Sequence, residues 1–358
     1  MIGASPEPAM LETASETYTI REYQAADEAA VLSLLIRSLG GGGSFDRTAE
    51  FWRWKHFQNA FGASQLLVAA NEEMLGLRAF LRWSFRTPQG RLRAVRAVDT
   101  ATHPEYRRLG VFARLTKEAL ARVHSDGVHM VFNTPNAQSM SGYMRLGWQW
   151  VGRPRLLVRI LNPVRCALGL VARSRRFGSS DDTAGIVGPS LRPVDSLFDH
   201  REHLERILDL DDRLCAKGIR TERSPAFIRW RYVLPPSPRY FVHWSGEKPV
   251  TGILIFRPNI RRGLREIMLS EFLIGYGAAL EMRVLIQELV RRVQADYLVA
   301  SASPGTQHWG MLRRAGFLPL PPSAGPNFTV RQLDLPPGAL DPVRLAHWRL
   351  SLGDLELF

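Results

Sequence analysis

The sequence predicts an α/β fold that occurs twice along the chain, and three observations lead to this prediction. The chain has 358 residues, whereas a single hydrophobic core stops growing at roughly 250 to 300 residues, so two domains are expected. Strand-like and helix-like apolar spacings alternate through the first half. The second half then repeats part of the pattern of the first.

The first half reads as alternating strands and helices. A short strand begins near Tyr18, and a helix with Asp27 as its candidate N-cap continues to Leu39. The apolar spacing further along predicts three strands between 65 and 101, a helix over 111–123, a buried strand over 128–133 and a short helix within 139–148.

An internal repeat relates the two halves. Residues 50–80 align without a gap to 226–256. The shared offset (230 − 54 = 176) pairs Phe51 with Phe227, Arg53 with Arg229, Trp54 with Trp230, Gly76 with Gly252, and Phe80 with Phe256. Near the end of each copy Gly147 pairs with Gly316 at an offset of 169 (316 − 147), so the second copy is shorter between these blocks. The missing residues fall at an arginine-glycine turn that only the first copy has.

These patterns divide the chain into five expected segments. They are a disordered lead (1–15), a first domain (16–160), a basic linker (161–190), a second, degenerate domain (191–335) and a C-terminal tail (336–358). The apolar, arginine-rich part of the linker either packs on the domains or lies on an anionic membrane surface, and both interpretations stay open.

Composition narrows the possible partners and location. The net charge of +13 permits nucleic acid, a membrane surface or phosphate-bearing small molecules, but no RNA-binding motif appears, so no stable nucleic-acid partner is expected. No apolar run reaches the roughly 18 to 20 residues of a membrane span, and the first twenty residues carry acids where a signal peptide carries basic residues. We therefore expect a cytoplasmic protein.

The sequence gives no support for a metal site. Cys166 and Cys215, the two cysteines, are far apart and form no CxxC pattern, so they read as free thiols. The histidines and acids of "DHREH" (199–203) and "DLDD" (209–212) read as solvated helix faces.

The segment "THPEYRRLGVF" (102–112) lies between a strand end and an amphipathic helix. The first N–H groups of a helix are unpaired and carry partial positive charge, which suits a phosphate. Gly110 lets the backbone approach a ligand closely, and Arg107 and Arg108 add positive charge. A basic turn with one glycine is also common without a ligand, so the segment alone leaves both interpretations open.

A second motif, "NAQSMSGYMRLGW" (136–148), follows this turn. Together the two resemble the GNAT superfamily, the GCN5-related N-acetyltransferases, whose motifs read R-x-x-G-x-G/A and then N-x-x-A-x-x-x-Y-x-x-x-G-F. The resemblance covers the first copy almost entirely and extends more faintly to the second. Two positions depart from the pattern: Arg108 stands where glycine is most common, and Phe112 stands where a small residue is usual.

The resemblance implies two tandem GNAT-like domains, each a mixed, mostly antiparallel sheet flanked by helices, with acetyl-CoA as the acyl donor. The turn would hold the pyrophosphate, and a splayed strand would pair with the pantetheine arm. The expected cofactor-binding residues are Ala101, Thr102, Arg107, Arg108, Leu109, Gly110, Val111, Phe112 and Asn136.

The resemblance also assigns catalytic roles. Tyr143 stands at the position that protonates the leaving thiolate, and Asp99 is the preferred base, with His103 and Glu105 as reserves. The alternatives are that Tyr143 only packs its helix and that Asp99 only caps its strand.

The second copy lacks the functional side chains of the first. Gly305 falls opposite Asn136, and Leu312 falls opposite Tyr143. We therefore expect the second copy to shape the acceptor cleft without catalysing the reaction.

The resulting prediction is an N-acetyltransferase that acts on a primary amine of a small molecule. An amino sugar of polysaccharide biosynthesis is the first candidate, with Phe45, Trp52 and Trp54 as a possible apolar wall and core packing as the alternative for Trp54. Two other functions are kept: a FemABX-like transferase that uses aminoacyl-tRNA, and a non-catalytic acyl-CoA-binding scaffold. Acyl chain length and oligomeric state stay open.

Overall fold

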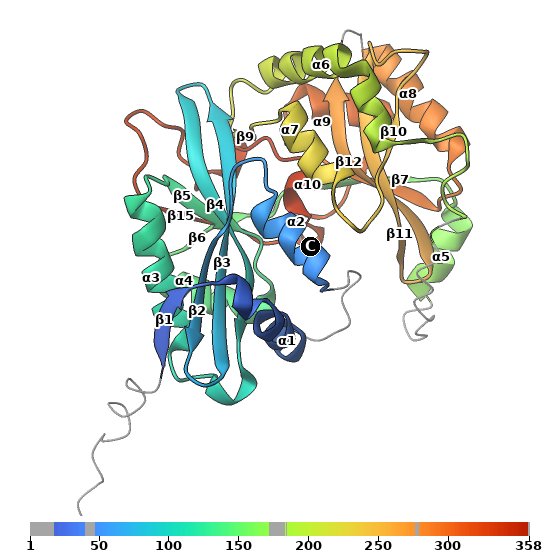
Figure 1. Ribbon diagram of the computed structural model, residues 1–358. Coiled ribbons are helices and arrows are strands. Elements are labelled where there is room, and N and C mark those ends of the chain that lie inside the picture. Colours follow the sequence, from blue (N-terminus) through green and yellow to red (C-terminus); the bar gives the residue numbers. More distant parts are fainter. Residues whose placement is uncertain (1–17, 40–46, 172–182, 184, 276–278, 357–358) are drawn as a thin grey trace, which may run out of the picture.

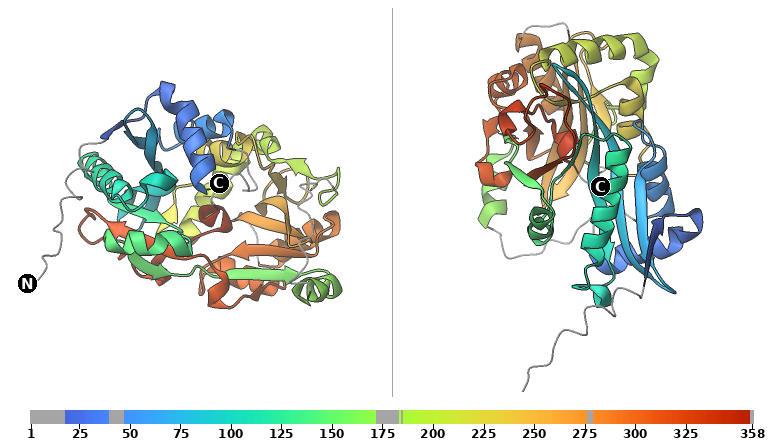
Figure 2. Two further views of the ribbon diagram at one scale, coloured as in Figure 1. Left: turned by 90° about the horizontal axis from the view of Figure 1, so that it is seen from below. Right: turned by 90° about the vertical axis from the view of Figure 1, so that its left-hand side faces the viewer.

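The computed structural model describes residues 18–39, 47–171, 183, 185–275 and 279–356. Its strands form two sheets, each flanked by helices, in two halves that lie side by side (Figures 1 and 2). Most strand pairs are antiparallel, which confirms the predicted fold class. The expected lead and Phe45 lie outside the described residues.

The first sheet has mainly antiparallel neighbours. Its strand order is β1 (Thr19–Glu22), β2 (Gln65–Ala70), β3 (Met74–Thr87), β4 (Gly90–Thr102), β5 (Met130–Asn133), β15 (Phe328–Gln332) and β6 (Gln149–Gly152). The helices of this half are α1 (Glu28–Leu39), α2 (Ala49–Phe57), α3 (Val111–Ser125) and α4 (Ala137–Arg145). A short strand, β9 (Arg220–Thr221), adds to the free end of β3.

The second sheet follows the same plan. Its order is β14 (Leu318–Pro319), β7 (Leu156–Ile160), β13 (Tyr297–Ser301), β12 (Leu264–Ile274), β11 (Gly252–Arg261), β10 (Phe241–His243) and β8 (Arg192–Pro193). The helices of this half are α5 (Pro163–Val171), α6 (Arg201–Leu214), α7 (Pro225–Ile228), α8 (Ala279–Arg292), α9 (Gln307–Arg314) and α10 (Leu352–Leu355).

The two halves exchange one strand each. β7 follows β6 in the sequence but lies between β13 and β14 of the second sheet, and β15 follows β14 but lies between β5 and β6 of the first (Figure 1). The expected boundaries at 160 and 335 therefore do not coincide with the sheets. Each sheet is completed by the other half of the chain.

Residues that the repeat aligns occupy equivalent places. A Cβ added to Gly76 would lie 2.7 Å from Val111 of α3, and one added to Gly252 would lie 2.6 Å from Met282 of α8. Both glycines thus allow a helix to pack closely on its sheet.

A pair of tryptophans that the repeat aligns joins the two halves. The indole Nε1 of Trp54 donates to the Trp230 carbonyl (2.7 Å), and the indole Nε1 of Trp230 donates to the Trp54 carbonyl (3.2 Å). This reciprocal pair is core packing, as the repeat suggested for Trp54.

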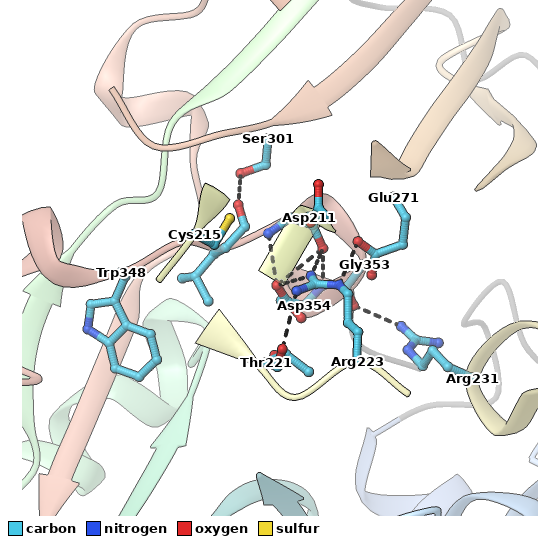
Figure 3. A network of polar contacts seen from close by, with 12 residues as sticks. Asp211, Cys215, Thr221, Arg223, Arg231, Glu271, Ser301, Trp348, Gly353 and Asp354 are labelled. Atoms are coloured by element: carbon cyan, nitrogen blue, oxygen red, sulfur yellow. Dashed lines mark hydrogen bonds and ion pairs between the residues drawn. The ribbon is translucent and has the colours of Figure 1, made fainter. Parts of the chain in front are cut away.

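The last part of the segment expected as a C-terminal tail, from Trp348 to Glu356, is largely buried between the halves. Around α10, Arg96 of β4 donates to the Asp354 and Leu355 carbonyls. Arg223 donates to the Asp354 carboxylate and to Glu271 (Figure 3). Arg231 donates to the Gly353 carbonyl. These contacts join both halves to the end of the chain.

Two local expectations are wrong. Asp27 does not cap α1 as its N-cap residue; it is the last residue of a short 3-10 turn, where it pairs with Arg21 and accepts from the Gln24 N–H. Asp211 of "DLDD" is not on a solvated face, because it is 6% exposed and accepts hydrogen bonds from Ile274 N–H and from His308. Strand pairing and a distant histidine, which the local pattern does not contain, explain this burial.

No helix among the described residues is long and apolar enough to cross a membrane. α5, in the expected linker, exposes Val164 and Leu168 (67% and 63%). Whether this face meets a membrane surface stays a prediction.

Candidate functional site

A cleft opens where β4 and β5 of the first sheet diverge. The two strands pair in parallel only from Ala94 to Arg96 of β4, and the end of β4 beyond them lines an opening. The cleft has a volume of about 590 Å³. It is lined by the end of α1, the end of β4 (Thr100, Ala101 and Thr102), the turn before α3, the start of α3 and one side of α4 along its length.

The N-terminus of α3 opens into this cleft. α2, α4, α7 and α9 each begin with a side chain that accepts from a backbone N–H, whereas α3 begins at Gly110, which has none. Gly110 has a left-handed φ of 77°, and a Cβ at this position would meet nothing within 4 Å. The uncapped N–H groups and the open space fit a pyrophosphate.

The arginines of the turn have different roles. Arg107 donates to the carbonyl of Ser38 at the end of α1 (3.2 Å), which anchors the turn. Arg108 is exposed and has a left-handed φ of 71°, a conformation that costs a non-glycine residue roughly 1 kcal/mol. Glycine adopts this conformation without the cost, which explains why it is most common at the position that Arg108 occupies here. Leu109 is 49% exposed and does not line the cleft.

Phe112 does not crowd the turn. Its ring packs edge-on against Tyr143 of α4, with ring centroids 5.7 Å apart. A Cβ at Gly142 would lie 3.2 Å from the Phe112 ring, so the glycine in α4 makes room for the phenylalanine in α3. The departure from a small residue at 112 is thus matched by a small residue at 142.

α4 brings Asn136 and Tyr143 to the opposite wall. The Asn136 side chain caps the helix by accepting from the Ser139 N–H (2.9 Å), so its carbonyl oxygen already has a partner within the protein. Tyr143 is 5% exposed, and its hydroxyl accepts a hydrogen bond from Nη1 of Arg78 (2.9 Å). Nη1 of Arg78 also donates to Thr100 Oγ1 (2.6 Å).

Arg78 is a buried cation that the sequence reasoning missed. It is 0% exposed, lies over the rings of Phe80, Phe112, Tyr143 and Trp148, and has no carboxylate partner among the described residues. Its Nε and Nη2 also lack hydrogen-bond partners in that part of the chain. The signal in the sequence was a single charged residue within the otherwise apolar run "MLGLRAFL".

Asp99 of β4 forms a buried ion pair with α2. Its Oδ2 lies 2.6 Å from Lys55 Nζ and 3.1 Å from His56 Nε2, both of α2. Burial alone would raise the pKa of Asp99, but the Lys55 charge and the His56 contact outweigh burial and hold this pKa well below its usual range. Burial lowers the pKa of His56. A carboxylate with a depressed pKa is a weak base, so this geometry favours a positioning role for Asp99.

The two reserve bases lie near the turn, whereas the tryptophans expected as an apolar wall lie in the core. His103 Nε2 approaches Nη1 of Arg37 (3.5 Å), and Glu105 is exposed. Trp52 is 3% exposed and packs on His56 with ring centroids 4.0 Å apart. Trp52 and Trp54 are therefore part of the core behind the cleft.

The second sheet has an equivalent opening that is largely filled. β12 and β13 pair in parallel only from Glu266 to Met268 of β12, as β4 and β5 do in the first sheet. Thr306 caps α9 as Asn136 caps α4, one position beyond the expected counterpart Gly305, and Leu312 is buried where Tyr143 lies in the first copy. The cleft between these strands has only about 40 Å³.

We predict a pH dependence of stability from His308, which lines this second cleft. Burial alone would lower the pKa of His308, but the Asp211 carboxylate and Cys215 raise it to about 10. The resulting stabilisation is fully present below the unfolded pKa of 6.5 and is lost as pH rises towards 10. Between pH 7 and 10 the unfolding free energy should fall by a few kcal/mol more in the wild type than in His308→Gln.

Urea denaturation at each pH measures this difference. His124→Gln at the exposed end of α3 is the matched control and should follow the wild type. Parallel curves for the wild type and His308→Gln would contradict the assignment.

Comparison with known proteins agrees with this geometry. A family model described as an acetyltransferase (GNAT) domain matches residues 19–151, which hold the cleft. No curated protein matches the chain in sequence.

Solved structures with the same fold extend over both halves. A conserved protein and probable N-acyltransferase of Enterococcus faecalis has a TM-score of 0.61 at 15% identity, covering 89% of this chain and 73% of that one. A GCN5-related N-acetyltransferase of Anabaena variabilis gives 0.60 at 13%, covering 88% and 73%, and Eis1 of Mycobacterium abscessus gives 0.52 at 16%, covering 89% and 74%. The uncapped α3 turn, the diverging strands and the matching family model lead to one conclusion: residues 19–151 form a GNAT acetyltransferase domain.

Proposed function

We propose that the chain transfers an acetyl or other short acyl group from acetyl-CoA to a primary amine of a small molecule. The observation that carries this proposal is the cleft of about 590 Å³ between the uncapped N-terminus of α3 and the start of α4, with Tyr143 in its wall. Acetyl-CoA supplies the acyl group as a thioester when it is bound.

The residues of the turn and of β4 bind and orient the donor. The N–H groups at the start of α3 and the charge of Arg108 would hold the pyrophosphate, while Arg107 holds the turn against α1. Beyond Arg96, the edge of β4 at Ala101 and Thr102 is free to pair with the pantetheine amides, because β5 has diverged.

Tyr143 protonates the leaving thiolate, and Arg78 prepares Tyr143 for this step. Because Arg78 donates to the hydroxyl oxygen, the hydrogen of that hydroxyl must point elsewhere, and the open direction is the cleft. Loss of this proton leaves a phenolate next to the buried guanidinium, which stabilises the negative charge. The amine nitrogen forms the new bond to the carbonyl carbon as the carbon–sulfur bond breaks.

The amine attacks in its neutral form and gives its proton to water. Asp99 holds Lys55 and His56 in place behind the strand, which supports a positioning role rather than that of the base. Any effect of Asp99→Asn on the reaction is thus expected to come from displacement of Lys55 and His56.

Tyr143→Phe is expected to lower kcat by roughly 10- to 100-fold and to leave the affinity for acetyl-CoA nearly unchanged, because only the proton donor is lost. Arg78→Met should lower kcat to a similar extent, and the double variant should be little slower than either single variant because the two residues act as a unit. Release of free CoA thiol in the presence of an amine measures the reaction.

Tyr18→Phe is the matched control for this series. Tyr18 is buried like Tyr143 but does not line the cleft, and its hydroxyl has no hydrogen-bond partner among the described residues, so its variant should keep the wild-type kcat. Additive losses in the double variant would remove Arg78 from the mechanism. An unchanged kcat in Tyr143→Phe would return Tyr143 to a packing role.

The acceptor is proposed at the level of its chemical class. An amino sugar of polysaccharide biosynthesis remains the first candidate. The second half, which packs against α2 through the Trp54–Trp230 pair, is proposed to shape the acceptor side without catalysing the reaction. Amine-dependent release of the thiol separates this function from a non-catalytic scaffold and from a FemABX-like transferase, which would need aminoacyl-tRNA. A cytoplasmic location is part of the same proposal.

A further inference from the structure

A cysteine, a histidine and an aspartate line up at the filled cleft of the second half. Nδ1 of His308, in the first turn of α9, lies 3.9 Å from Sγ of Cys215, and Nε2 of the same ring lies 2.7 Å from Oδ1 of Asp211. Asp211 and Cys215 lie one helical turn apart at the end of α6 (Figure 3). The imidazole is therefore held between an acid and a thiol.

The surroundings of the triad favour a charged imidazole. The Asp211 carboxylate contacts one nitrogen directly. Other ionisable groups line the cleft: Arg223 and Glu271 are paired with each other, and Arg349 donates to the Ala346 and Trp348 carbonyls. An imidazolium beside a thiol favours the thiolate, which is the nucleophilic form.

The geometry does not suit a metal ion. The ligand atoms of the three residues lie within 4.8 Å of one another, but the two contacts of His308 use opposite nitrogens of one ring. An ion bound at Nδ1 beside the thiolate would have the Asp211 carboxylate on the far side of the ring. Oδ1 of Asp211 is also occupied by the Ile274 N–H (2.9 Å). The arrangement is that of a nucleophile with its base and orienting acid.

The size of the cleft limits what the thiol can meet. Residues 349–351 lie in it, and Ser301 and Ser303 donate to the Leu350 and Trp348 carbonyls, which fixes this segment in place. The remaining 40 Å³ holds a few water-sized molecules. CoA does not fit, whereas a small hydroperoxide does. Cys215 lines this cleft and is only half-buried.

We propose that Cys215 is a modification site for small hydroperoxides, activated by His308 and oriented through Asp211. This site is separate from the acyl-transfer cleft, and it does not depend on the function proposed for that cleft. Its substrate class is hydrogen peroxide or a hydroperoxide of similar size.

The reaction balances with the residues of the triad. The Cys215 thiolate attacks one oxygen of the peroxide, a sulfur–oxygen bond forms and the oxygen–oxygen bond breaks. Sulfur is oxidised to the sulfenic acid and the peroxide is reduced. The departing hydroxide takes the proton of the His308 imidazolium and leaves as water, and solvent then returns a proton to His308.

The chain provides its own matched control in Cys166. This thiol is also half-buried, but its Sγ faces the Asp296 carbonyl (3.6 Å), and burial raises its pKa. Full-length reduced protein is treated with sub-millimolar hydrogen peroxide in the presence of dimedone, and labelling of each cysteine is followed by peptide mass spectrometry. Cys215 should react at least about tenfold faster than Cys166.

Variants connect this rate to the triad. His308→Gln should slow labelling of Cys215 by about tenfold, towards the rate of Cys166. If His308→Gln melts below the assay temperature, Asp211→Asn replaces it and should slow labelling in the same direction.

Three results would overturn the proposal. They are equal labelling rates at the two cysteines, an unchanged rate at Cys215 in a folded variant of the triad, and one equivalent of zinc bound to the purified protein that Cys215→Ser releases. The last result would identify a metal site in place of a reactive thiol.

Discussion

A chain that ends at residue 190 is expected to be unfolded or aggregated, although it contains the whole acyl-transfer cleft. Without β15, the strand β6 loses its ladder and β5 is left with an open edge. Phe328 and Val330 are 1% and 0% exposed, and burial of each such side chain contributes roughly 1.5 to 3 kcal/mol. The two side chains together contribute roughly 3 to 6 kcal/mol, which overlaps the low end of the roughly 5 to 15 kcal/mol by which a typical domain is stable.

Loss of the second half also uncovers the core between the halves. Trp54, Trp83 and Phe85 of the first half share one buried cluster with Trp230 and Trp348 of the second. In the truncated chain this aromatic surface is exposed to water, which promotes association.

Size-exclusion chromatography and thermal melting of the 1–190 and full-length chains measure this effect. Co-expression of 1–190 with 191–358 is the control, because the two pieces together contain both exchanged strands, and it should restore a soluble complex. A monomeric 1–190 chain with a cooperative melting transition would contradict the prediction.

Gly110→Asp is expected to reduce the affinity for acetyl-CoA by at least about 100-fold. The carboxylate would lie at the N-terminus of α3, where the pyrophosphate is proposed to bind. Repulsion between unit charges about 4 Å apart at an effective dielectric constant near 20 amounts to roughly 4 kcal/mol, and solvent at this exposed turn reduces it to about 3 kcal/mol.

Gly110→Asn distinguishes the effect of the added negative charge from the effect of the added side chain. Asparagine has nearly the same size as aspartate and also tolerates the left-handed φ of 77° at this position, and the added Cβ meets no atom within 4 Å. Titration calorimetry with acetyl-CoA should therefore give a much smaller loss for asparagine than for aspartate. Equal losses would mean that the N-terminus of α3 excludes side chains by shape and does not hold an anion.

The sequence predicted the elements of the first half well because their apolar spacing is local. The strand run from 65 to 101, the helix over 111–123 and the helix that bears Tyr143 all appear close to their expected places. The left-handed position of Gly110 follows from the same local chemistry, since glycine adopts it without strain.

Contacts between distant segments were outside the reach of local patterns. β7 reads as an ordinary strand at the end of the first half, and nothing in its sequence indicates that it pairs with β13. Asp99 reads as a free acid at a strand end, because Lys55 and His56 that bind it come from a helix earlier in the chain.

Because β15 is synthesised late, the first sheet can be completed only when most of the chain has been made. The ribosome must add 180 further residues (332 − 152) after β6 before the strand that joins β5 to β6 exists. At 5 to 20 residues per second this interval lasts roughly 10 to 40 s. Throughout it, β5 and β6 each present an unpaired edge, where strands of other chains can pair.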